Sequence, residues 1–170
     1  IDYMGSGKSR MAVALMKLGS FDRIVVVQDD RYNLMQARFS PDEKRIAFAS
    51  RIQAGRSRLY VAPLGNSSTP KENWVALTDG KSWDTAPQWS PNGKLLYYTS
   101  SRDGFRCIWA QAVSRTGPEG SPFPIAHFHQ ARRSPRLVPF GANDMHVAAA
   151  EIVTTVGELT GNIWMAVTLE

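Results

Sequence analysis

ARFSPDEKRIAFAS, the stretch at residues 37–50, returns at residues 87–100 as PQWSPNGKLLYYTS. The two copies are 50 positions apart and share an aromatic residue, Ser-Pro-Asp/Asn, a lysine, an apolar run and a closing serine. Proline presets φ for a turn, and Asp or Asn can bond its own backbone two residues on. Each copy therefore predicts a tight turn followed by a strand, and period-two alternation in the first copy would bury Ile46 and Phe48 on one side.

A second match follows each copy. Leu59-Tyr60, Ile108-Trp109 and Ile163-Trp164 are aliphatic-aromatic pairs spaced 49 and 55 positions apart. Short strands that recur with a period near 50 residues are typical of propeller blades or a related array. The fold class that we expect is all-β, a β-propeller fragment of about three four-stranded blades.

The repeats divide the chain into four segments. Residues 1–36 would be the remnant of a preceding blade and a linker, 37–80 and 81–130 two blades, and 131–170 a degenerate C-terminal blade. Residues 117–122 are interpreted as a loop before a fourth strand over 123–128, where Pro124 suits an outer edge. In the last segment we expect strands over 136–140, 145–149, 151–156 and 159–167. The chain begins at Ile1 rather than Met, so we expect a piece of a longer protein.

Composition excludes several classes of protein. With 43% hydrophobic and 21% charged residues, the chain has the composition of a soluble globular protein. No apolar run approaches the roughly 18 residues of a membrane helix. The net charge of +5 comes from basic residues spread along the chain, which favours a solvated basic surface over nucleic-acid binding. The single cysteine, Cys107, excludes an internal disulfide and is interpreted as a small buried hydrophobe in a strand.

Residues 5–9, GSGKS, leave two interpretations open. They could end a phosphate-binding loop, with a helix over residues 10–18, in a P-loop nucleotide-binding protein. However, Asp2 stands where that pattern requires glycine, and a carboxylate there would repel phosphate. We favour the alternative, in which Ser6-Gly7-Lys8 is a hairpin turn between two strands of a blade.

The repeats resemble the TolB-type (WD40-like, PD40) propeller repeats of bacterial proteins. Their hallmarks are aromatic-Ser-Pro-Asp-Gly-Lys, then Ser-x-Arg-Asp-Gly, then an Ile-Trp strand. Residues 89–109 match almost throughout, whereas residues 39–60 have Glu43 in place of glycine and no Asp-Gly before the third strand. The resemblance implies that the fragment is part of a six-bladed or larger TolB-like ring. It also favours a periplasmic or extracytoplasmic location over the cytoplasm, although one cysteine is compatible with either.

The sequence lacks the nucleophile motif of a serine peptidase. No Gly-x-Ser-x-Gly nucleophile elbow occurs. His127 and His129 would face one side of a strand, but no third ligand is apparent nearby, so they are interpreted as polar strand tips. Asp103 is expected to bond backbone amides within its own hairpin. The sequence therefore predicts no enzyme activity, no catalytic residue, no metal site and no cofactor.

The predicted function is that of a non-enzymatic scaffold for protein-protein interaction or ligand sensing. A protein partner or small ligand would bind at the loops of the propeller mouth. The candidate contacts are Trp83, Arg102, Arg132 and Arg133. The alternative is an accessory propeller domain of a peptidase, another hydrolase or a kinase. Because propeller blades rely on their neighbours to cover their faces, self-association through open blade faces is also expected.

Overall fold

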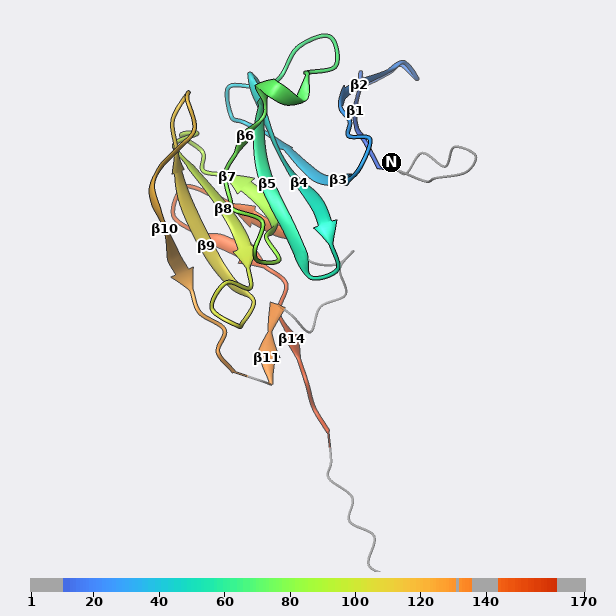
Figure 1. Cartoon of the computed structure of the whole chain (residues 1–170). Helices are drawn as coiled ribbons and strands as arrows, with labels where there is room; N and C mark the ends of the chain where they lie inside the picture. Colours follow the sequence, from blue (N-terminus) through green and yellow to red (C-terminus); the bar gives the residue numbers. More distant parts are fainter. Residues whose placement is uncertain (1–10, 131, 136–143, 162–170) are drawn as a thin grey trace, which may run out of the picture.

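Strands form nearly all the regular structure of the described residues. The computed structural model describes residues 11–130, 132–135 and 144–161 (Figure 1). In chain order the strands are β1 (Val13–Met16), β2 (Arg23–Val27), β3 (Asn33–Phe39), β4 (Arg45–Gln53), β5 (Arg56–Pro63), β6 (Val75–Ala76), β7 (Thr85–Trp89), β8 (Leu95–Ser100), β9 (Cys107–Val113), β10 (Pro118–Ala126), β11 (Arg133–Ser134), β12 (Met145–Val147), β13 (Ile152–Thr154) and β14 (Gly157–Glu158). One short 3-10 helix, η1 (Lys71–Asn73), precedes β6.

Two four-stranded antiparallel sheets make up the centre of the molecule. Their strand orders are β3-β4-β5-β6 and β7-β8-β9-β10, so each strand pairs with its neighbour in sequence. This is the arrangement of a propeller blade, and the two sheets lie side by side in Figure 1. The prediction of an all-β propeller fragment is therefore confirmed. The first sheet begins at Asn33, earlier than the repeat suggested, and the division into four segments stays a prediction.

The first sheet is buried on both faces. Residues 46–50 of β4 are all buried, so burial continues on the side opposite Ile46 and Phe48, where only one buried side was expected. Alternate residues enter two different cores. One core joins Ile46 and Phe48 to the β1–β2 hairpin, with Val26, Val27, Leu34, Ala62 and Trp74. The other joins the two blades, with Met35, Ala47, Ala49, Leu59, Val61, Leu77, Trp89, Leu96, Tyr98 and Val113.

The repeated Ser-Pro motif builds the same hydrogen-bond network twice. The Ser40 hydroxyl donates to Asp42 Oδ1 at 2.6 Å and accepts the Arg45 N–H at 3.0 Å. In the second copy the Ser90 hydroxyl donates to Asn92 Oδ1 at 2.8 Å and accepts the Leu95 N–H at 2.9 Å. The serine is required because a single hydroxyl makes both bonds, which explains why the motif recurs.

Glu43 and Gly93 occupy equivalent positions in these turns and share a left-handed backbone. Their φ angles are 55° and 69°. Glycine adopts this conformation without steric cost, whereas a residue with a Cβ does not. The departure of Glu43 from the repeat pattern therefore places a strained residue in the first blade.

β10 is longer than predicted. Residues 117–122, interpreted as a loop, lie largely in this strand, because Pro118 pairs with Val113 and Glu119 with Ala112. The Gln111 side-chain amide also donates to the carbonyl oxygens of Glu119, at 2.8 Å, and Gly120, at 3.2 Å. β10 forms the edge of its sheet, as Pro124 indicated.

The N-terminal hairpin corrects one alternative. Residues 13–16 form β1, which pairs antiparallel with β2, so the helix that a phosphate-binding loop would need over residues 10–18 is absent there. The sequence itself indicates strands, since Ile24, Val25, Val26 and Val27 are β-branched. Residues 5–9 and the turn expected at Ser6-Gly7-Lys8 lie outside the described residues. So do the strand expected over 136–140 and the pair Ile163-Trp164.

The connection between the blades buries a carboxylate. Asp84 is fully buried, and its backbone N–H donates to Ser57 Oγ at 2.8 Å. Among the described residues, neither carboxylate oxygen has a hydrogen bond of good geometry, and Arg102 Nη2 lies 3.8 Å away. Burial raises the pKa of Asp84 above its usual value, and nearby Ser100, Thr78 and Arg102 oppose this only in part.

Replacing Glu43→Gly is expected to stabilise the protein. Glycine removes the left-handed strain at the cost of a more flexible unfolded chain, so the free energy of unfolding should rise by about 0.5–1 kcal/mol. Urea unfolding followed by circular dichroism measures the change. The matched variant Gly93→Ala should destabilise the protein. A Cβ at this position would meet only Pro41, at an ordinary contact distance of 3.5 Å, so backbone strain is the main effect of the substitution. A urea midpoint of the Glu43→Gly variant below that of the wild type would contradict this account.

Asp84→Asn should stabilise the protein at pH 7 and change little near pH 4. Because its pKa is raised in the folded state, Asp84 binds a proton more tightly there than in the unfolded chain. The stability of the protein therefore falls as pH rises from the usual pKa of an aspartate to the raised pKa of Asp84. The amide removes this loss, and we expect a gain of about 1 kcal/mol at pH 7. Urea unfolding at both pH values tests the difference.

The control for that experiment is Asp79→Asn. Hydrogen bonding from the Lys81 backbone lowers the pKa of Asp79, so removing its charge should cost stability at pH 7. A loss of stability in Asp84→Asn that is larger at pH 7 than at pH 4 would refute the assignment of a costly buried charge.

Candidate functional site

Three connections meet at one end of the two blades. The β4–β5 turn, the end of the β6–β7 connection and the β8–β9 turn lie together at the lower end of the sheets in Figure 1. Antiparallel strands alternate in direction, so every second connection of each blade emerges at this end. Loops presented by a rigid sheet are common positions for binding residues.

A shallow groove runs between the blades at this end. Its volume is about 420 Å³, and it is lined by Gly55, Trp83, Ser101, Gly104 and Arg106. We call this the Trp83 groove. Its lining comes from all three connections, so its shape depends on the packing of one blade against the other.

Both the backbone and the ring of Trp83 contact neighbouring residues. Its backbone N–H donates to Ser101 Oγ at 3.0 Å, and the next residue, Asp84, is fully buried. The Arg51 guanidinium carbon lies 5.8 Å from the centre of the Trp83 ring, within the range of a cation–π contact. These contacts hold the half-buried Trp83 at the loop end of the blades.

Arg102 packs into the second blade. Its Nη2 donates to the Tyr98 hydroxyl at 2.7 Å and its Nε to Ser100 Oγ at 3.1 Å. The guanidinium carbon also lies 4.8 Å from the Trp109 ring centre. Arg102 lines a neighbouring hollow of about 330 Å³ rather than the Trp83 groove. These contacts stabilise the blade, and a role in binding stays a prediction.

Arg132 and Arg133 lie apart from the groove. Arg133 pairs with Glu158 across the two-stranded β11–β14 sheet, with Nη2 3.1 Å from Oε2. The Arg132 carbonyl oxygen accepts the Leu159 N–H at 2.7 Å. The structure thus brings Trp83 and Arg102 to neighbouring connections. It leaves Arg133 in the β11–β14 sheet and Arg132 in the turn just before it.

Sequence reasoning missed several residues that lie around Trp83. Gly55, Arg51 and Arg106 approach Trp83 only because the hairpins of two blades pack side by side. Arg51 is 32 positions from Trp83, and no spacing rule links them. A repeat-based alignment could have indicated that the connections share one end, but not which side chains meet there.

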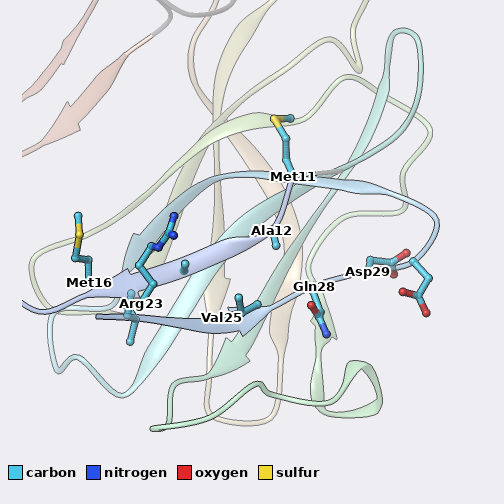
Figure 2. A pocket seen from close by; sticks show the side chains of 10 residues that line it. Met11, Ala12, Met16, Arg23, Val25, Gln28 and Asp29 are labelled. Atoms are coloured by element: carbon cyan, nitrogen blue, oxygen red, sulfur yellow. The ribbon is translucent and has the colours of Figure 1, made fainter. Parts of the chain in front are cut away.

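A second hollow lies on the β1–β2 hairpin. Its volume is about 520 Å³, and Figure 2 shows Met16 and Arg23 toward one end of it and Gln28 and Asp29 toward the other. Met16 is 51% exposed and Val25 39%, so the surface is apolar and open. Propeller blades cover such faces with a neighbouring sheet. The hollow has the character of an interblade face rather than of a ligand site.

Within residues 11–130, 132–135 and 144–161, no helix is long and apolar enough to cross a membrane.

Comparison with known proteins agrees with the architecture. The family model described as the TolB beta propeller domain, PD40, matches residues 1–152. A curated relative, the Tol-Pal system protein TolB of Alcanivorax borkumensis, is 32% identical over 82 residues, which are 48% of this chain. The match spans only 18% of that protein's length. Because the family model covers most of the sequence and both complete blades, the chain belongs to the TolB β-propeller family.

Proposed function

We propose that the chain is a non-enzymatic interaction module that binds a partner protein through the Trp83 groove. The observation that carries the proposal is a half-buried tryptophan, held at the loop end between two blades with guanidinium groups beside it. Tryptophan and arginine are the residues that most often dominate the energy of protein interfaces. A groove on packed hairpins also loses little conformational entropy on binding.

The charge around the groove favours an acidic segment. Arg51 and Arg56 are exposed on the β4–β5 hairpin, Lys81 is exposed on the β6–β7 connection, and Arg106 lines the groove itself. Cationic side chains around an aromatic ring suit a peptide that combines carboxylates with an apolar anchor. We therefore propose an acidic peptide segment with a large apolar residue that contacts Trp83.

The comparison with a known protein supports a role in a system of several proteins. The relative from Alcanivorax borkumensis is named as a protein of the Tol-Pal system. We extend to this chain a role in a multi-component system and a location outside the cytoplasm. Fractionation of cells that carry the full-length gene tests the location, and recovery of the protein with the cytoplasmic fraction would contradict it.

Trp83→Ala should abolish most of the binding. A peptide array of acidic sequences with one apolar residue identifies a binding peptide, whose affinity is then measured by fluorescence anisotropy. We expect loss of the indole to weaken binding by about 30-fold, typical of an interface hot spot of about 2 kcal/mol. Arg51→Ala and Arg106→Ala should each weaken it several-fold and reduce its salt dependence.

Matched controls lie at the opposite end of the blades. Phe39, at the end of β3, is 52% exposed, and Arg115 is exposed between β9 and β10. Phe39→Ala and Arg115→Ala should bind the peptide like the wild type. If Trp83→Ala binds equally well, or Phe39→Ala loses as much affinity, the groove is not the binding site.

A further inference from the structure

Four metal-ligating side chains converge at the outer part of the second blade. Asp103 comes from the β8–β9 turn, Cys107 begins β9, and His127 and His129 follow the end of β10. One ligand atom from each lies within 4.8 Å of all the others. The strand register explains this, because Ala126 pairs with Ile108 and so brings the chain after β10 beside Cys107 and the turn before it.

Three of the ligand atoms form a nearly regular triangle. His127 Nδ1 lies 3.2 Å from Asp103 Oδ2 and 3.1 Å from His129 Nε2, and His129 Nε2 lies 3.0 Å from Asp103 Oδ2. Ligands of a tetrahedral zinc ion at about 2.0–2.1 Å are separated from one another by about 3.3–3.4 Å. The three atoms therefore sit close to the spacing that a bound ion imposes.

Hydrogen bonds can satisfy at most two sides of this triangle. An N–H points along one direction, and the other two corners of such a triangle are about 60° apart, so one proton cannot serve both. A neutral imidazole has one N–H, and a carboxylate has none. At least one side of the triangle therefore lacks a good hydrogen bond, whereas a cation near its centre would satisfy all three atoms.

The surroundings fix the ligands in these orientations. The second oxygen of Asp103 accepts the Phe105 N–H at 3.2 Å, as expected for a residue in its own hairpin. The His129 ring packs on Phe105, with centroids 4.6 Å apart, and His127 meets Trp109 edge-on at 6.0 Å. The buried Cys107 sulfur accepts the Phe128 N–H at 3.3 Å. Contacts of this kind, between metal ligands and the residues around them, commonly orient the ligands of metal sites.

We propose that Asp103, Cys107, His127 and His129 form a zinc-binding site. Two imidazole nitrogens, one carboxylate oxygen and one sulfur are a donor set that zinc accepts in tetrahedral geometry. The ion would tie the end of the edge strand β10 to the β8–β9 turn. Gly104, next to Asp103, lines the Trp83 groove, so the ion would also order one wall of that groove.

Zinc binding to the full chain tests the site directly. Equilibrium dialysis with zinc alone, followed by metal analysis, should find one ion per chain. His127→Ala and His129→Ala should each weaken binding at least 10-fold, and zinc should raise the thermal midpoint of the wild type but not of these variants. Circular dichroism confirms that the variants fold, which we expect because both histidine side chains are about half exposed.

His146 provides a matched control. It is the third histidine of the chain, exposed like the others, and its Nε2 lies 3.2 Å from Asp144 Oδ2. His146→Ala should bind zinc like the wild type. Zinc binding that survives the double variant His127→Ala/His129→Ala, or that is lost in His146→Ala, would overturn the proposal, as would the absence of zinc binding by the folded wild type.

Cobalt reports on the fourth ligand. Co²⁺ in the wild type should give the intense d–d bands of a tetrahedral ion and a sulfur-to-cobalt charge-transfer band. Cys107→Ser should lose the charge-transfer band, and Cys107→Ala serves if the serine variant does not fold. A charge-transfer band that persists without Cys107 would overturn the assignment of the sulfur.

Discussion

The structure depends on burying the β3–β6 sheet on both faces at once. Ile46 and Phe48 pack toward the first hairpin, while Ala47 and Ala49 pack toward the next blade. The small alanines leave room for the large Trp89 and Tyr98 that approach from the other side. Because neighbouring residues of one strand serve two different cores, the packing of the first hairpin and the packing of the second blade both depend on β4. The relative position of the two blades, and with it the Trp83 groove, follows from this packing.

The blade architecture could be predicted because its determinants are local and repeated. Ser40 and Ser90 use one hydroxyl to close equivalent turns, so the requirement for serine is visible in the sequence twice. The start of β10 was missed because it depends on a contact with another strand rather than on a local, repeated motif. A proline and glycine-rich stretch favours a loop by composition, but the side chain of Gln111, in the preceding strand, holds its backbone as an edge strand.

The candidate sites were largely beyond prediction, because they form between residues distant in sequence. Trp83 was identified as a contact, but its partners Arg51 and Arg106 belong to hairpins of two different blades. His127 and His129 were recognised as facing one side, yet Asp103 and Cys107 approach them only through the register of β9 with β10. Arg102 was predicted to be a binding contact, and the structure gives it partners within its own blade.

The prolines of β10 determine how a partner can approach. Three of the nine residues in this edge strand, Pro118, Pro122 and Pro124, have no N–H to offer. An added strand from another molecule would meet gaps in the donor pattern along this edge. Recognition by strand addition, and the edge-to-edge pairing of sheets that leads to aggregation, are both disfavoured here. The long outer strand of the second blade is therefore protected against pairing with a strand of another molecule.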